Sequence, residues 1–280
     1  MRLFDAHCHL QDPRIRHCLE DTIKATEGQG VQQFACNGTC EDDWPQVAQL
    51  AKTHHNIKPN FGLHPWFLQS RSDKWLDNLR KQLEEVPRAG LGECGLDTSK
   101  KVQTPIHEQE EVFRAQLELG KELQRPISVH CVSAFGKLQE MLQQHGPFAQ
   151  GLILHSWIGP AEMVDALAKI QGVFFSLSGH LTRMSKKKYE PMVKKIPLER
   201  LLLETDAPDG RPRLGDVWGT YQEQLLNFQS QDGTEDQELN HPANIRIMLE
   251  LLADIRGQEA ETIADAAFSN AESLFCFSSK

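Results

Sequence analysis

The sequence predicts a single α/β domain folded as a (β/α)8 TIM barrel, and three observations support this prediction. Eight short apolar stretches, each of strand length, recur along the 280 residues. Polar segments with a helical period separate them, and neither a sequence repeat nor a Gly/Ser linker divides the chain. A doubly wound open sheet is the structural alternative, but no glycine-rich phosphate-binding loop supports it.

The eight predicted strands share a run of apolar residues bounded by polar ones. They cover residues 3–6, 31–36, 57–63, 88–93, 126–131, 150–155, 172–178 and 200–205. Between them, segments such as 108–124 and 241–256 repeat apolar residues every three to four positions, which is typical of a helix with one buried face. Residues 209–239 form the longest polar stretch. We expect a loop there, beside the mouth of the barrel and partly helical around 221–228.

Composition and charge limit the class of protein. A hydrophobic content of 39% and a charged content of 25% are typical of soluble globular chains. No window approaches the ~18 apolar residues of a membrane helix, and the first strand does not resemble a signal peptide. Seven cysteines, an odd number, favour free thiols and a cytoplasmic or nuclear location. Nothing in the sequence indicates an obligate protein partner. The net charge of −9 predicts that any nucleic acid is bound locally and weakly.

His7 and His9, at the end of the first predicted strand, are the most informative pair of residues. Alternate residues of a strand point to the same face, so the two imidazoles project together. Neutral imidazole is the commonest nitrogen ligand for a divalent metal. The pair therefore predicts half of a metal site, although a His-x-His motif alone is more often structural.

Four further candidate ligands are predicted at the ends of later strands: Glu93, His130, His155 and Asp206. Active sites of (β/α)8 barrels lie at the carboxyl ends of the strands, so all of these side chains are expected at one mouth. Together with the first pair they supply four imidazoles and two carboxylates. A buried carboxylate must be paired or bound to something, so this set is electrostatically costly without a cation.

Two divalent ions fit these residues better than one. An open zinc site takes about three protein ligands, so the six candidates make two sets if Glu93 bridges them. A bridged pair activates a water and stabilises the oxygens of a displacement reaction. Asp206 is suitably placed to hold one ion and to orient or deprotonate that water. The imidazoles suit Zn, Mn, Co or Ni, whereas Mg prefers more oxygen ligands.

Seven short motifs follow one another in order between residue 3 and about residue 275. They are Asp5–Leu10, Gly62–Pro65, Gly92–Asp97, Arg125–His130, His155–Gly159, Leu203–Pro208 and Asn240–Asn244. In this combination the chain resembles the TatD-type metal-dependent hydrolases of the amidohydrolase-like barrels. The resemblance implies one ion held by His7, His9, Glu93 and Asp206, and a second held by Glu93, His130 and His155. It also implies phosphodiesterase activity on DNA as substrate, typically trimming from the 3′ end.

The chain departs from the family pattern at two places. The position two after His130 is often arginine in the family but is Val132 here, which removes an expected contact to an anionic substrate. Residues 98–101 read Thr-Ser-Lys-Lys where an aromatic residue is frequent. Neither departure touches a candidate ligand, so both concern substrate preference.

Three residues near the predicted mouth are candidate substrate contacts. His64 ends the third strand and either contacts a substrate phosphate or is a structural histidine. Arg183 precedes the basic run 186–188 after the seventh strand, a plausible steering patch although such runs are usually solvated. Glu204 shares a strand face with Asp206, which suits a supporting hydrogen bond better than catalysis.

Five other residues, three cysteines and two histidines, are of metal-binding types but are expected outside the metal shell. Cys8, Cys94 and Cys131 each directly follow a candidate ligand, so strand pleating should turn them toward the helices. His54 and His55 precede the third strand, and we expect them on the surface at the opposite end of the barrel.

The leading functional hypothesis is a two-metal deoxyribonuclease or other phosphodiesterase. The second is a hydrolase of the same fold that acts on an amide or ester, such as an aminoacyl-tRNA deacylase. Amide-hydrolysing relatives often bridge their metals with a carbamylated lysine, so Glu93 at this position favours phosphoesters. The third is a non-catalytic metal-binding scaffold, against which an intact Asp206 beside a full ligand set argues.

Overall fold

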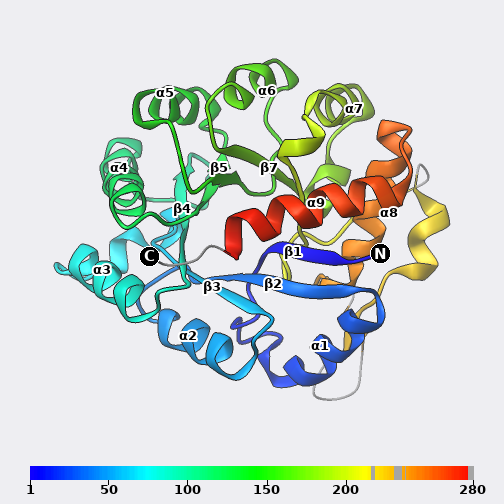
Figure 1. Cartoon of the computed structure of the whole chain (residues 1–280), viewed down its shortest axis with the longest axis horizontal. Coiled ribbons are helices and arrows are strands. Elements are labelled where there is room, and N and C mark those ends of the chain that lie inside the picture. Colours follow the sequence, from blue (N-terminus) through cyan, green and yellow to red (C-terminus); the bar gives the residue numbers. More distant parts are fainter. Residues whose placement is uncertain (216–217, 230–234, 237, 277–280) are drawn as a thin grey trace.

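Eight parallel strands follow one another around a barrel in chain order, as seen in a computed structural model of the chain (Figure 1). The structure describes residues 1–215, 218–229, 235–236 and 238–276. Helices alternate with the strands and surround them. The prediction of a (β/α)8 barrel is therefore confirmed, and the open-sheet alternative is wrong.

The barrel strands are β1 (Leu3–Cys8), β2 (Val31–Asn37), β3 (Ile57–Phe61), β4 (Gly90–Asp97), β5 (Ile127–Val132), β6 (Leu152–Leu154), β7 (Val173–Leu177) and β8 (Leu201–Leu203). The helices are α1 (Leu19–Gly28), α2 (Trp44–Thr53), α3 (Trp75–Glu85), α4 (Ile106–Glu122), α5 (Phe135–His145), α6 (Ala161–Ala168), α7 (Lys186–Lys195), α8 (Ile245–Arg256) and α9 (Ala260–Phe275). The short 3₁₀ helices are η1 (Arg16–Cys18), η2 (Pro65–Ser70), η3 (Gly179–Arg183), η4 (Leu198–Arg200), η5 (Gly219–Gln224) and η6 (Pro242–Asn244).

All eight predicted strands are present, but β4 continues four residues beyond its predicted end. Glu93 therefore lies inside this strand and not at its end, which corrects the sequence-based boundary. The extension arises because β4 and β5 remain paired as far as Asp97 and Val132. The strands β6 and β8 are instead shorter than predicted, with three residues each.

The amino end of the barrel is covered by α9, which crosses it in Figure 1. Phe4 of β1 packs against Phe275 and Phe268 of this helix, with ring centroids 5.3 Å and 6.3 Å away. These aromatic residues belong to one buried apolar cluster with interior residues of other strands, such as Ile153 and Leu202. With this end covered by a helix, the opposite, carboxyl end of the barrel is the one where a cleft opens.

The barrel closes between β1 and β8 through bonds just below that cleft. The backbone N–H of Asp206 donates to the carbonyl of His7 (2.9 Å), and the N–H of His9 donates to the carbonyl of Ala207 (2.7 Å). The fully buried carboxylate of Asp5 accepts from the N–H (2.9 Å) and the hydroxyl (2.5 Å) of Thr205. These bonds join two segments about 200 residues apart and fix the backbone on which three candidate ligands stand.

Two buried glutamines of α4 hold the loops that follow β3 and β4. Gln116 donates to the carbonyl of Leu63 and accepts from its N–H, at 3.1 Å and 2.8 Å. Gln109 makes the same pair of bonds with Asp97, at 3.0 Å and 2.8 Å. The apolar period did not predict these contacts, because it places polar residues of a helix on its solvent face. Here a side-chain amide replaces the strand partner that each loop lacks.

The segment 209–239 leaves the barrel after β8, as predicted, and its helical part is shorter than expected. The 3₁₀ helix η5 ends at Gln224, and Phe228 lies in a two-residue strand, β9 (Phe228–Gln229), paired antiparallel with β10 (Glu235–Asp236). Residues 216–217, 230–234 and 237 of the predicted loop lie outside the described residues. Among all described residues, no helix has both the length and the hydropathy to cross a membrane.

His241 begins the short helix η6 that leads from this segment into α8. Its Nδ1 accepts a hydrogen bond from the N–H of Ala243 (3.1 Å), and its ring lies 4.8 Å from that of Phe228. Burial lowers the pKa of His241 to about 4, from an ordinary value of 6.5. The hydrogen bond from Ala243 also favours the neutral ring, because only an unprotonated nitrogen can accept a hydrogen bond.

Between pH 6.5 and 4, the unfolded chain binds a proton at His241 that the folded chain does not. The free energy of unfolding therefore falls as the pH is lowered through this window, by up to about 3 kcal/mol from this group. His241→Asn keeps an acceptor for Ala243 but does not titrate. We expect urea unfolding at pH 7 and pH 4.5 to show a smaller loss of stability in this variant. An equal loss in both proteins would contradict the prediction.

Candidate metal centre

The centre is organised around the carboxylate of Glu93, whose two oxygens face different pairs of histidines. Oε2 lies 3.3 Å from Nε2 of His7 and 3.3 Å from Nε2 of His9. Oε1 lies 2.8 Å from Nε2 of His155 and 3.0 Å from Nδ1 of His130. The four imidazoles predicted from strand ends therefore meet at one carboxylate, two on each side.

Asp206 completes the group on the side of His7 and His9. Its Oδ1 lies 3.5 Å from Nε2 of His9 and 3.9 Å from Nε2 of His7. Its Oδ2 accepts from Nε2 of His180 at 3.0 Å. The backbone of Asp206 is left-handed, with φ 56°, a conformation that aspartate tolerates better than most residues. All six predicted ligands thus lie together.

Two irregular strands direct the side chains into the centre. On β1, Phe4 and Ala6 face the barrel interior whereas Cys8 packs in the outer core, and the register with β2 shifts between Asp5 and Cys8. On β4, Leu91 and Cys94 both pack in the outer core, with a register shift between them. Strict alternation would have placed Leu91 and Glu93 on the same face. The shift turns the carboxylate inward instead.

Gly92 makes the irregularity of β4 possible. Its φ of 137° is a conformation that L-residues with a side chain rarely adopt, and a Cβ there would lie 2.7 Å from the carbonyl oxygen of Ser128. Glycine at this position is therefore required by both the backbone conformation and the close approach of β5.

Each imidazole of the centre has its outward nitrogen next to an oxygen. The pairs are His7 Nδ1 with Ser128 Oγ (2.9 Å), His9 Nδ1 with the carbonyl of Asn37 (2.8 Å), His130 Nε2 with Asp97 Oδ2 (3.3 Å) and His155 Nδ1 with Glu204 Oε1 (3.5 Å). For His7, His9 and His130 this contact is a hydrogen bond, which leaves the inward nitrogen with a free lone pair, the tautomer that metal coordination needs. Nδ1 of His155 lies close to Glu204 without a hydrogen bond.

The charges of the centre are strongly coupled. Burial alone raises the pKa of Glu93, but the neighbouring imidazoles of His155, His64 and His7 hold it well below its usual value. Burial likewise opposes ionisation of Asp206, yet the hydrogen bonds from His180 and His9 keep its pKa well below the ordinary one. Two ionised carboxylates in a buried site require positive charge beside them.

The donor set fits divalent cations. Burial lowers the pKa of His9 and His155, but Glu93 and its neighbouring carboxylates raise both pKa values well above the ordinary one. Inward nitrogens also face each other closely, at 3.3 Å between His7 and His9 and 3.1 Å between His130 and His155. A cation among these lone pairs would satisfy them together with the carboxylates.

His64 lies beside this group but presents a proton and not a lone pair. Its Nδ1 accepts from the N–H of Trp66 (3.1 Å), so the proton of the neutral ring is on Nε2, 3.4 Å from Oε1 of Glu93. Burial lowers the pKa of His64 to about 4, which keeps the ring neutral near pH 7. His64 is close enough to Glu93 and His130 to share an ion with them. Its tautomer favours the role of hydrogen-bond donor.

A cleft of about 890 Å³ opens over the centre. Five of the predicted ligands line it, His9, Glu93, His130, His155 and Asp206, whereas His7 is fully buried behind them. Its walls also include the predicted substrate contacts His64 and Arg183, together with Val132. Lys186–Lys188, the basic run after Arg183, are exposed on α7 and do not line the cleft.

Glu204 is not part of the cleft wall. It is fully buried, and its Oε1 accepts from the N–H and the hydroxyl of Ser156 at 2.6 Å and 2.8 Å. The same oxygen is the outward partner of His155. This position favours the supporting hydrogen bond expected from the sequence over direct contact with a substrate.

The cysteines lie outside the centre, with one deviation from expectation. The thiols of Cys8 and Cys94 are buried and donate to the carbonyls of Ala35 (3.5 Å) and Ser128 (3.6 Å). Cys131 is only partly buried and lines the cleft, so the expectation that it is buried against the helices is wrong. The reason is its position near the end of β5, where the strand leaves the packed part of the barrel.

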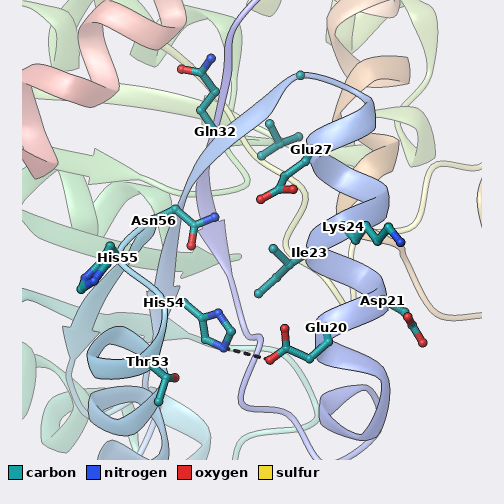
Figure 2. A pocket seen from close by; sticks show the side chains of 12 residues that line it. Glu20, Asp21, Ile23, Lys24, Glu27, Gln32, Thr53, His54, His55 and Asn56 are labelled. Atoms are coloured by element: carbon teal, nitrogen blue, oxygen red, sulfur yellow. Dashed lines mark ion pairs between the residues drawn. The ribbon is translucent and has the colours of Figure 1, made fainter.

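His54 and His55 belong to a separate surface groove between α1 and the turn before β3 (Figure 2). Nε2 of His54 lies 3.4 Å from Oε1 of Glu20. The groove shares no lining residue with the cleft. The expectation that these two histidines lie away from the metal centre is therefore confirmed.

Sequence reasoning missed three residues that contact the centre. His180 comes from η3 and not from a strand end, and a lone histidine in an irregular segment gives no recognisable signal. Asp97 stands in the motif Gly92–Asp97 but was given no role, because β4 was predicted to end before it. Ser128 gave no signal because a serine inside an apolar strand is usually structural.

The chain is similar in sequence to several known proteins. The Escherichia coli metal-dependent hydrolase YjjV is 28% identical over 276 residues, 98% of each chain. The Escherichia coli 3′-5′ ssDNA/RNA exonuclease TatD is 26% identical over 279 residues, again 98% of each chain. The human deoxyribonuclease TATDN3 is 27% identical over 286 residues, covering 98% of this chain and 94% of that protein.

A comparison with solved structures and a comparison with protein families both match TatD-related proteins. The crystal structure of the TatD homologue YjjV from Escherichia coli superposes with a TM-score of 0.84 at 26% identity, covering 99% of both chains. The family model described as TatD related DNase matches residues 4–276. The chain belongs to this family of metal-dependent hydrolases.

Proposed function

We propose that this chain is a phosphodiesterase that cleaves DNA with two divalent ions, removing nucleotides from the 3′ end. The observation that supports this most directly is the carboxylate of Glu93, which faces one histidine pair with each oxygen. One ion would be held by His7, His9, Glu93 and Asp206, and the other by Glu93, His130 and His155. The predominance of imidazole favours Zn, Mn, Co or Ni over Mg.

Metal ions in such a site lower the pKa of a bound water and stabilise negative charge on phosphate oxygens. The chain itself supplies the base. Asp206 is ionised, lines the cleft, and has its Oδ2 held by His180 at 3.0 Å. The remaining oxygen, Oδ1, is thereby oriented toward the centre, where it can accept the proton of an attacking water.

His64 would bind the phosphate on the opposite side of Glu93 from His7 and His9. Its ring is neutral, and its Nε2 carries the proton because Nδ1 accepts from Trp66. A neutral donor in a buried site can bond a phosphate oxygen without adding a charge that competes with the cations. Val132 adds no charged contact, so Arg183 is the guanidinium of the cleft that we assign to the substrate.

The substrate and the cellular setting are inferred from the relatives and from charge. Relatives named as a 3′-5′ ssDNA/RNA exonuclease and a deoxyribonuclease match over nearly the whole chain. The family match from residue 4 to 276 supports one catalytic domain over residues 1–280. All seven cysteines are free, which agrees with a cytoplasmic or nuclear location.

Glu93→Gln and Cys94→Ala test the ligand assignment with two adjacent positions. Glu93→Gln removes the bridging charge, and we expect bound metal, measured by elemental analysis, to fall from two equivalents to one or fewer. Cys94 points into the outer core, so Cys94→Ala should keep both equivalents while lowering stability by about 1–2 kcal/mol. Retention of both equivalents by a folded Glu93→Gln protein would contradict the assignment.

Asp206→Asn tests the base. The amide keeps the size and one oxygen ligand but loses the charge that accepts a proton. We expect cleavage of a single-stranded DNA oligonucleotide to fall by roughly 10²–10⁴, with most of the metal retained. EDTA should abolish wild-type activity, and Mn²⁺ or Mg²⁺ should restore it. A wild-type enzyme with both metals bound that hydrolyses an aminoacyl ester but no phosphodiester would establish the ester-hydrolase alternative instead.

His64→Ala separates phosphate binding from proton transfer. The lost hydrogen bond exists in both the ground state and the transition state, so we expect KM to rise about tenfold with a smaller change in kcat. His64→Gln can still offer an N–H donor and should recover part of the loss. Steady-state kinetics on the same oligonucleotide measure both effects, and a fall confined to kcat would assign His64 to the chemical step.

A further inference from the structure

Two neighbouring aromatic side chains stand exposed at the wall of the cleft. Trp66 and Phe67, at the start of η2, are 44% and 38% exposed, and both line the cleft. Among the described residues, the only other large apolar side chains exposed to this degree are Met1 and Leu226, and neither lines the cleft. Exposed aromatic surface next to a reactive centre is unusual in a globular chain, since aromatic residues gain most by burial.

The side chain of His64 lies between this aromatic pair and the proposed ligand Glu93. The ring centroid of His64 lies 5.1 Å from that of Trp66 and 6.1 Å from that of Phe67. The indole N–H of Trp66 donates to Oδ2 of Asp97 at 2.6 Å, and the same oxygen lies 3.3 Å from Nε2 of His130. A group bound on the indole would therefore adjoin a phosphate bound at the centre.

Positive charge lies on the same wall. Nζ of Lys101 is 4.7 Å from the centroid of the Trp66 ring, and this lysine is exposed and lines the cleft. A lysine on an aromatic face is held by a weak cation–π contact. The lysine can therefore move to a phosphate oxygen while another flat group takes its place on the ring.

We propose that Trp66 and Phe67 form a base-stacking platform that binds an unpaired nucleobase next to the scissile phosphate, with Lys101 pairing to the adjacent phosphate. This inference rests on the proposed phosphodiesterase function and assigns its recognition of single strands to particular residues. Stacking on aromatic side chains tolerates any sequence, because every base has a π-face. A duplex hides its base faces, so the platform selects single-stranded ends.

If Trp66 has a purely structural role, loss of its indole N–H should impair the enzyme as much as loss of its ring. In that case the indole matters only because its N–H holds Asp97, and through it the ring of His130. Trp66→Phe separates the two roles, because it keeps a flat ring but removes the N–H. Trp66→Ala removes both, and Leu226→Ala is a matched control with the same exposure as Phe67 outside the cleft wall.

The test compares a single-stranded DNA oligonucleotide with the same strand whose two 3′-terminal nucleotides lack bases. For Trp66→Ala in the metal-loaded enzyme, we expect KM on the natural strand to rise about tenfold, and KM on the abasic strand to change less than about twofold. Trp66→Phe should stay within about threefold of wild type on both strands, and Leu226→Ala should be unchanged. Lys101→Gln should weaken binding of both strands and lower its salt dependence.

A second measurement does not depend on turnover. A strand with a non-hydrolysable 3′ linkage should quench the tryptophan fluorescence of the metal-loaded wild-type protein, and should quench it much less when its terminal bases are absent. Trp66→Phe should lose this base-dependent quenching, because none of the other four tryptophans lines the cleft.

The outcomes separate the platform from the function on which it rests. Cleavage by wild type, with equal effects of Trp66→Ala on natural and abasic strands, would overturn the platform and leave the phosphodiesterase intact. A Trp66→Phe enzyme as impaired as Trp66→Ala would also overturn it, in favour of the bond to Asp97. If wild type cleaves no phosphodiester, the proposed function fails. In that case base-dependent quenching alone would support a nucleotide-binding platform, and its absence would refute it.

Discussion

The carboxylate of Glu93 between two histidine pairs is the constraint on which the rest of the centre depends. A buried carboxylate needs positive charge or hydrogen bonds on every side, and here the imidazoles of the four candidate ligands and that of His64 surround it. Each imidazole in turn needs a fixed outer partner to keep its inward nitrogen available. Oxygens of Ser128, Asn37, Asp97 and Glu204 occupy those outer positions.

The two ends of the barrel have different roles in holding these residues in place. At the amino end, α9 covers the interior and packs aromatic residues against Phe4, so this end contributes stability. At the carboxyl end, the bonds between β1 and the segment after β8 are made by backbone groups of the ligands themselves. The backbone positions of His7, His9 and Asp206 are therefore set by the closure of the barrel, at the end where active sites of this fold generally lie.

The sequence was sufficient to predict the barrel and to select six candidate ligands that the fold brings together, because both follow from strong local patterns. Apolar runs mark strands, and polar residues at their carboxyl ends mark the mouth. What could not be predicted arises from departures from those patterns. The inward direction of Glu93 depends on an irregularity at Gly92, and the outer partner of His130 lies beyond the predicted end of β4. Strand alternation correctly predicts that His7 and His9 point the same way. It does not predict that Phe4, an odd number of residues from both, also faces the barrel interior.

Residues from irregular segments were the hardest to anticipate. His180 and Trp66 lie in 3₁₀ helices that follow β7 and β3, where no periodicity constrains the direction of a side chain. Both contact a carboxylate beside the centre: His180 bonds Asp206, and Trp66 bonds Asp97. Such residues can only be found once the fold brings the loops together.

Charge explains how a protein with a net charge of −9 could accept the polyanion proposed as its substrate. Arginines that line the cleft differ in whether their charge is already paired with a carboxylate. Arg14 is paired with both Asp12 and Asp209, at 2.8 Å and 2.9 Å, so it stabilises the rim. Arg183 makes no ion pair with any residue that the structure describes, and burial together with nearby Arg213 lowers its pKa. An exposed guanidinium on the cleft wall, without an ion-pair partner among the described residues, can pair bidentately with an incoming phosphate. The attraction is therefore confined to the cleft, while the remaining acidic surface repels nucleic acid that is not bound there.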